Sequence, residues 1–225
     1  MSGFGGYPRS DGRKGIRNVF VVAYLVECAH HVARQITLEF RNHDVHLIGF
    51  PGCYPNEYAQ RMMEALCTHP NVGGALLVSL GCESFNNRLL REQIEATGRP
   101  VKAITIQQVG GTRSAIAEGM SFIAEHLPAL ERAERVPMGV DELVIGTICG
   151  GSDGTSGITG NPAAGRAFDM LIGDGAACIF EESGELIGCE HIMAARAATP
   201  ALAAVLEESV AKAARYYATL GYGSF

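Results

Sequence analysis

Short apolar runs alternate with amphipathic segments along most of the chain. Val19–Leu25 is a continuous, valine-rich run, which is typical of a strand buried on both faces of a sheet. After it, Val32, Ile36 and Phe40 recur at every fourth residue, as they would on one face of a helix. The same alternation predicts strands near 45–50, 75–80 and 101–106, each followed by a helix, near 56–67, 85–97 and 113–126.

The pattern breaks near residue 131 and then resumes. Residues 131–141 are charged and contain Pro137 and Gly139, so we interpret them as a linker. Residues 1–18 are rich in glycine and arginine, and we interpret them as an irregular lead-in. Beyond the linker the pattern predicts strands near 143–148 and 177–181, and helices near 163–173 and 200–217.

Strands that alternate with helices of this length predict an α/β fold built from βαβ units. We expect residues 1–136 to form a Rossmann-like, mostly parallel sheet with flanking helices. Residues 141–225 are expected to form a smaller α/β segment at the C-terminus. A segment of about 85 residues is marginal as an independent core, so we expect it to pack on the first part or on another chain.

Composition narrows the classes of partner. The chain is 47% hydrophobic and 19% charged, with a formal net charge of −6 and no dense block of Lys and Arg. Nucleic acid is therefore not expected as a partner, because phosphate binding needs clustered cations. No stretch approaches the ~20 apolar residues of a membrane span, and residues 1–10 lack the apolar core of a signal peptide. We expect a cytoplasmic protein without membrane association.

Cysteines follow several of the predicted strands. Ligands of an open parallel sheet bind at the carboxyl ends of its strands, and there the sequence places Cys28, Cys53, Cys82 and Cys149. A nearby helix N-terminus favours the thiolate, which is a ligand for transition metals and iron–sulfur clusters. For each cysteine alone, a small buried packing residue is the alternative. Their shared position favours a site that the fold assembles.

The loop 149–161, CGGSDGTSGITGN, is the most concentrated signal. Its glycines allow the backbone to approach a ligand closely, and the hydroxyls of Ser152 and Ser156 suit a polyhydroxy or carboxylate substrate. Asp153 could act as a base or as a metal ligand. The loop lacks the Gly-Lys-Ser/Thr ending of a P-loop. The alternative is a flexible turn before a helix, with Asp153 or Ser156 as its cap.

Two other places carry candidate groups. Glu190 precedes His191, which sets a carboxylate beside an imidazole that titrates near neutrality. Thr112 and Arg113 follow a Gly-Gly turn after the fourth strand, where the guanidinium could clamp a substrate carboxylate. The alternatives are a surface pair for Glu190 and His191, and an exposed first-turn residue for Arg113.

Blocks along nearly the whole chain resemble the altronate/galactarate dehydratase family, and they occur in the family's order. These blocks are Gly6–Asn18, Val72–Gly74 with Leu80–Glu83, Gly110–Arg113, Cys149–Ala163, and Gly188 with Glu190–His191. The resemblance covers the family's second domain and the start of its C-terminal domain. Members are lyases that dehydrate sugar acids to 2-keto-3-deoxy acids and require an Fe(II)-type metal, and a related branch removes sulfite from sulfolactate.

The resemblance implies a hydro-lyase that acts on a sugar acid or a similar small hydroxy-acid. We expect proton transfer by His191 or Asp153, with Glu190 beside the histidine. The expected substrate-binding residues are Arg113, Thr112, Gly151, Ser152, Ser156 and Asn161. The expected ligands of Fe(II), of another divalent metal, or of an iron–sulfur cluster are Cys28, Cys82 and Cys149.

Family members carry a small domain before the first block and continue well beyond the last. We therefore expect a fragment or one subunit of a split enzyme, in a homo-oligomer or with a companion subunit that supplies the missing domains. Three interpretations stay open. The chain is a lyase subunit acting on a sugar acid or on sulfolactate, or a non-catalytic subunit that binds an anion or metal, or a structural partner whose tail completes another chain's core.

Overall fold

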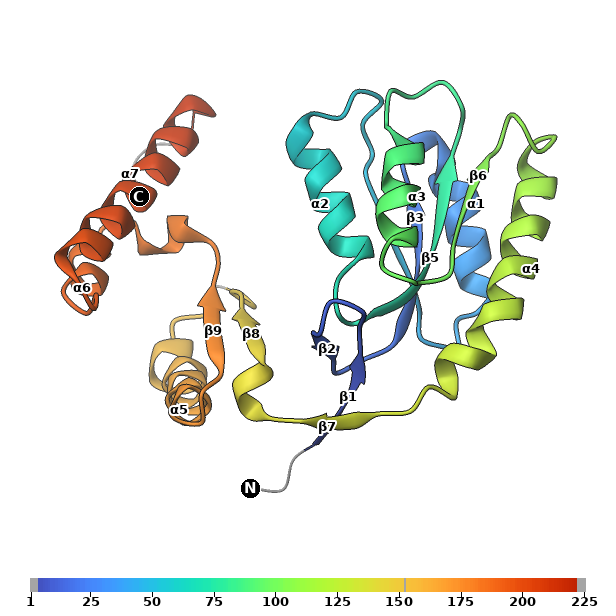
Figure 1. Cartoon of the computed structure of the whole chain (residues 1–225). Helices are drawn as coiled ribbons and strands as arrows, with labels where there is room; N and C mark the ends of the chain where they lie inside the picture. Colours follow the sequence, from blue (N-terminus) through green and yellow to red (C-terminus); the bar gives the residue numbers. More distant parts are fainter. Residues whose placement is uncertain (1–3, 152, 222–225) are drawn as a thin grey trace. The chain divides into compact units, whose positions relative to one another are not determined.

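The structure, a computed structural model, describes residues 4–151 and 153–221 (Figure 1). The chain divides into two compact units, Met1–Gly139 and Val140–Phe225. The expected α/β fold with a parallel sheet and flanking helices is confirmed. No helix among the described residues is both long enough and apolar enough to span a bilayer.

Unit 1 is built around a parallel four-stranded sheet in the order β4-β3-β5-β6. Its strands are β3 (Val19–Tyr24), β4 (Val45–Gly49), β5 (Val72–Ser79) and β6 (Val101–Thr105). They are connected and followed by α1 (Glu27–Glu39), α2 (Glu57–Cys67), α3 (Asn87–Glu95) and α4 (Thr112–Glu131). Each of these elements overlaps one that the sequence predicts.

The sheet is buried on both faces, as the continuous apolar runs predict. Alternate side chains of a strand point to opposite faces. Phe20 and Val22 of β3 pack in a cluster with residues of α1 and α4, whereas Val21 packs in a second cluster with residues of α2 and α3. The sheet therefore lies between two helical layers, which leaves the ends of its strands as the places where loops can build a site.

A small antiparallel sheet, in the order β2-β1-β7, corrects two expectations. Its strands are β1 (Phe4–Pro8), β2 (Lys14–Gly15) and β7 (Val136–Met138). The lead-in is therefore not irregular, and the linker contains a strand. Phe4 of β1 is opposite Met138 of β7, so the pairing joins the two ends of unit 1. The strands are only two to five residues long, too short to show a periodic pattern, and the pairing of β1 with β7 joins segments that are distant in the sequence.

The last turn of α4 also differs from the expectation, since the helix continues past Pro128 to Glu131. Proline inside a helix removes one hydrogen bond and crowds the preceding turn. Leu127 and Leu130 are buried against the sheet-side cluster in this turn. The packing of these two leucines stabilises the last helical turn by more than the proline destabilises it.

Unit 2 contains a two-stranded parallel sheet of β8 (Val144–Thr147) and β9 (Ala177–Phe180). Its helices are α5 (Gly160–Gly173), α6 (Glu190–Ala194) and α7 (Pro200–Thr219), and its 3-10 turns are η1 (Val140–Glu142), η2 (Ser156–Ile158) and η3 (Ser183–Leu186). Within the described part of this unit, the buried apolar residues are Ala176, Ala194 and Val210. Val144 and Ile179 remain 68% and 58% exposed, so the faces of this sheet are far less covered than those of unit 1.

Replacing Gly111 with alanine is expected to destabilise unit 1 by about 1–3 kcal/mol. Gly111 precedes α4 with φ 102° and ψ −171°, a region that is essentially restricted to glycine. No atom lies within 4 Å of a Cβ built there, so the cost is backbone strain and not a clash. Urea unfolding measures it, with Ser114→Ala in the same turn as the control. Equal stabilities of the two variants would contradict the strain argument.

Candidate functional site

Three loops meet at the carboxyl edge of the unit 1 sheet. Cys28, Cys53 and Cys82 follow β3, β4 and β5, and all three are exposed. The Ser84 N–H donates to the Cys53 carbonyl at 2.9 Å, and the Glu27 N–H donates to the Pro51 carbonyl at 3.1 Å. Although the loops are joined, neither Cys28 nor Cys82 belongs to a group of three close ligand side chains among the described residues.

Cys149 follows a strand of a different sheet, which corrects the expectation of a rim shared by all four cysteines. It follows β8, and β8 pairs with β9 in unit 2 rather than with the strands of unit 1. The sequence pattern identified a strand before Cys149 correctly. It did not reveal which sheet that strand joins, because pairing depends on distant residues.

A pocket of about 1040 Å³ opens in unit 2 around the glycine-rich loop. Its lining comes from the end of β8, the loop itself, the start of α5, and the segment from β9 into η3. Of the residues expected to bind substrate or transfer protons, it contains Gly151, Asp153, Ser156 and Asn161. Ser152, also expected to contact substrate, lies outside the described residues.

Asp153 organises the loop. Its carboxylate accepts hydrogen bonds from the Thr155 N–H at 2.9 Å and from the Thr155 hydroxyl at 3.0 Å. These bonds, the backbone one first, hold the pKa of Asp153 below its usual range. The Ser156 hydroxyl donates to the Asp153 carbonyl at 2.6 Å. Asp153 thus stays ionised at neutral pH. Its contacts remain within the loop: α5 begins after Thr159 without a side-chain cap, so neither Asp153 nor Ser156 is the helix cap of the alternative interpretation.

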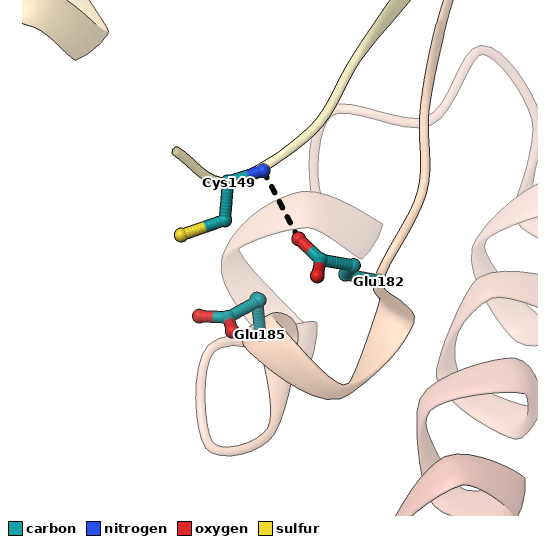
Figure 2. A group of neighbouring side chains, drawn as sticks. All are labelled: Cys149, Glu182 and Glu185. Carbon is teal, nitrogen blue, oxygen red and sulfur yellow. Dashed lines mark hydrogen bonds between the residues drawn. The ribbon is translucent and has the colours of Figure 1, made fainter. Parts of the chain in front are cut away.

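Cys149, Glu182 and Glu185 form a group whose possible ligand atoms all lie within 4.8 Å of one another (Figure 2). The Cys149 N–H donates to a carboxylate oxygen of Glu182 at 3.0 Å. Glu182 has a left-handed backbone, with φ 62°, and it begins the turn that carries Glu185. All three side chains are exposed and line the pocket. One thiolate and two carboxylates are a donor set that fits a divalent transition metal.

The sequence interpretation missed Glu182 and Glu185. They follow β9 directly, as Cys149 follows β8, so the rule that ligands gather at the carboxyl ends of parallel strands applies to both strands. Applied to the predicted strand at 177–181, the rule would have singled out the acidic residues after it.

His191 and Glu190 are not part of the pocket lining. Both lie at the start of the five-residue helix α6, and His191 is exposed. The Glu190 carboxylate accepts a hydrogen bond from the Gly188 N–H at 2.6 Å, which fixes the turn before the helix. The structure therefore does not bring this pair together with the glycine-rich loop.

Thr112 and Arg113 occupy the first turn of α4 in unit 1. Arg113 lines a separate groove of about 690 Å³ with other residues of α4, such as Met120, and with Phe40 and His43 of the segment that follows α1. This groove is mainly apolar where it borders α4.

Elsewhere in the unit, burial raises the pKa of the Cys67 thiol to about 12, so Cys67 is a packing residue and not a ligand.

Comparison with known proteins identifies the family of the chain. Residues 6–131 match the family described as D-galactarate dehydratase/Altronate hydrolase, second domain, and residues 140–223 match D-galactarate/Altronate dehydratase, C-terminal. An altronate dehydratase of Bacillus subtilis (strain 168) is 31% identical over 208 residues, which cover 87% of this chain and 41% of that protein.

Two other relatives differ in their names. The (2R)-sulfolactate sulfo-lyase subunit beta of Chromohalobacter salexigens is 33% identical over 200 residues, 87% of this chain and 50% of that subunit. A galactarate dehydratase (L-threo-forming) of Escherichia coli (strain K12) is 34% identical over 144 residues, 61% of this chain and 28% of that protein. The chain thus spans half or less of the length of each of these relatives.

Proposed function

Because the chain belongs to the D-galactarate dehydratase/altronate hydrolase family, we propose that it is part of a lyase that eliminates water from a sugar acid or a similar small hydroxy-acid. The observation that carries the proposal is the unit 2 pocket. There a glycine-rich loop and a thiol with two carboxylates converge. Backbone N–H groups of the loop would bind the substrate carboxylate, and the hydroxyl of Ser156 would contact the polyol.

In this proposal Cys149, Glu182 and Glu185 would hold Fe(II) or another divalent metal. Such an ion supplies Lewis acidity at the substrate carboxylate, which makes the neighbouring C–H more acidic. Asp153 lines the pocket and is the proposed acceptor of that proton, although its lowered pKa makes it a weak base. His191 does not line the pocket, and its proposed role as the acid that protonates the departing hydroxyl as water rests on the family resemblance of the block Gly188 with Glu190–His191. Loss of activity without loss of fold in His191→Ala is the result that this role requires.

A sulfo-lyase is the second candidate, favoured by the match to the sulfolactate sulfo-lyase subunit. It would use the same removal of a proton beside the carboxylate, with sulfite leaving in place of water. A non-catalytic role in a split enzyme is the third. The exposed apolar side chains of unit 2, such as Val144 and Ile179, support assembly with further polypeptide, from a second copy or from a companion subunit.

Anaerobic purification followed by assays with altronate, galactarate and sulfolactate tests the proposal. Formation of a 2-keto-3-deoxy acid supports the hydro-lyase, and release of sulfite supports the second candidate. Iron and acid-labile sulfide are measured on the same sample. Iron without sulfide agrees with a mononuclear site, whereas iron with sulfide would replace that site by a cluster held by cysteines. A metal-loaded chain that turns over none of the three acids, alone or with its co-purifying partner, would contradict the lyase assignment.

A further inference from the structure

Three arginines gather at the amino end of the unit 1 sheet, away from the loops at its carboxyl edge. Arg9 and Arg13 come from the segment around β1 and β2, and Arg99 precedes β6. All three donate to the backbone of the segment between α2 and β5. Arg9 Nε reaches the Pro70 carbonyl at 2.6 Å, and the Nη2 atoms of Arg13 and Arg99 both reach the Thr68 carbonyl, at 3.3 and 3.1 Å. Two guanidinium groups therefore share one carbonyl oxygen.

The cluster carries more positive than negative charge. The Asp11 carboxylate accepts from Nε and Nη2 of Arg13 at 2.8 and 2.6 Å. Within residues 4–151 and 153–221, Arg9 and Arg99 donate to carbonyl and amide oxygens and form no ion pair. One carboxylate thus faces three guanidinium groups. Buried or half-buried charges are ordinarily paired with an opposite charge. With one carboxylate for three guanidinium groups, this cluster lacks part of its counter-charge.

The positive charges lie close enough to repel one another. Burial, and then the charge of Arg99, lower the pKa of Arg9 to about 10. Burial, and then the charges of Arg13 and Arg99, also lower the pKa of His69, which lies in the same segment. An anion bound among these groups would relieve the repulsion.

A buried nitrogen of the cluster has no hydrogen-bond partner among the residues that the structure describes. Arg99 is only 7% exposed, its Nε donates to the Val72 carbonyl at 2.8 Å, and its Nη1 is buried without an acceptor among the described residues. A buried donor left unsatisfied costs about 1–3 kcal/mol, and more when it is charged. Phosphate and carboxylate oxygens are the strongest acceptors for guanidinium groups.

We propose that Arg9, Arg13 and Arg99 form a binding site for a small oxyanion, a phosphate or a carboxylate, at the amino end of the unit 1 sheet. The site uses the arginines of the Gly6–Asn18 block, which the lyase proposal leaves without a role. It lies in unit 1 and does not rest on the lyase proposal. Ligand binding there would also strengthen the connection of β1 and β2 to the segment before β5.

Calorimetric titration of the full chain with inorganic phosphate at constant ionic strength tests the site, with acetate in a parallel experiment. Saturable binding is expected, and Arg9→Gln and Arg99→Lys should each weaken it by about tenfold. Lysine keeps the charge of Arg99 but not its planar fork of donors. The matched control is Arg88→Gln on α3, whose side chain is 77% exposed and pairs with Glu92, and it should bind as the unchanged chain does.

Asp11→Asn keeps the proposal testable even if the arginine variants unfold. Removing the competing carboxylate is expected to tighten phosphate binding by several-fold, a gain that damage to the fold cannot produce. Preference for phosphate over acetate would identify a phosphate-type ligand, and the reverse preference a carboxylate. Absence of saturable binding of both anions, or equal affinity in Asp11→Asn and the unchanged chain, would overturn the proposal.

Discussion

Replacing Cys149 with alanine is expected to weaken Co(II) binding to the chain by at least about tenfold, because loss of even an outer-shell partner of a metal ligand costs 10–100-fold. Co(II) serves as a probe of the proposed site because a coordinated thiolate gives it a charge-transfer absorption in the near ultraviolet. The Cys149 Sγ is the one sulfur in the group with Glu182 and Glu185. That absorption should therefore disappear in Cys149→Ala, whatever the activity of the chain.

The matched control for this substitution is Cys189→Ala. Cys189 is exposed and belongs to the same unit, but it does not line the unit 2 pocket. Its loss should leave both the affinity and the absorption unchanged. Glu185→Gln should weaken binding while the sulfur absorption persists. A thiolate–Co(II) band that survives in Cys149→Ala would show that other cysteines bind the metal, with Cys28 and Cys82 as the next candidates.

Replacing Leu76 with alanine is expected to lower the free energy of unfolding of unit 1 by about 3 kcal/mol, within the range of 2–5 kcal/mol for buried leucines. Leu76 lies on the central strand β5 and is fully buried. A Cβ built on Gly119 of α4 would lie 3.0 Å from its Cδ2, so the side chain fills the space against that helix. Truncation to alanine would therefore leave a cavity against that helix.

Urea unfolding followed by far-ultraviolet circular dichroism measures this loss, and Leu89→Ala is its control. Leu89 lies on α3 and is 38% exposed, so the same truncation should cost at most about 1 kcal/mol. Similar losses for the two variants would contradict burial of β5 between two helical layers. If the dependence of the unfolding free energy on urea concentration changed in Leu76→Ala alone, the variant would unfold by a different route from the unchanged chain, and the two free energies could not be compared directly.

Local patterns were sufficient to predict the strands and helices of the main sheet, but not which strands pair. The run at Val19–Leu25 is apolar at every position up to Leu25, and a strand with that property must be covered on both faces. The small sheet was missed because Gly5 pairs with Pro137, and neither residue favours a strand. Helix α4 was predicted too short because the packing of Leu127 and Leu130 outweighs the local effect of Pro128.

The candidate site was predicted only in part for a related reason. The glycine-rich loop is contiguous, so Asp153, Ser156 and Asn161 could be identified together, and they line one pocket. The contact between Cys149 and Glu182 joins residues 33 positions apart. It exists because β8 and β9 are parallel neighbours, and a single sequence predicts each strand without predicting that they pair. The roles of His191, Glu190 and Arg113 stay predictions.

The pairing of β1 with β7 has a consequence for how unit 1 can be combined with other modules. Because Gly6 is opposite Val136, the polypeptide enters and leaves the unit through neighbouring strands. A module whose two ends are adjacent can be inserted into a loop of a host protein without stretching either connection. Unit 1 is therefore suited to transfer as a cassette, and its fusion into an exposed loop of an unrelated carrier should preserve its fold.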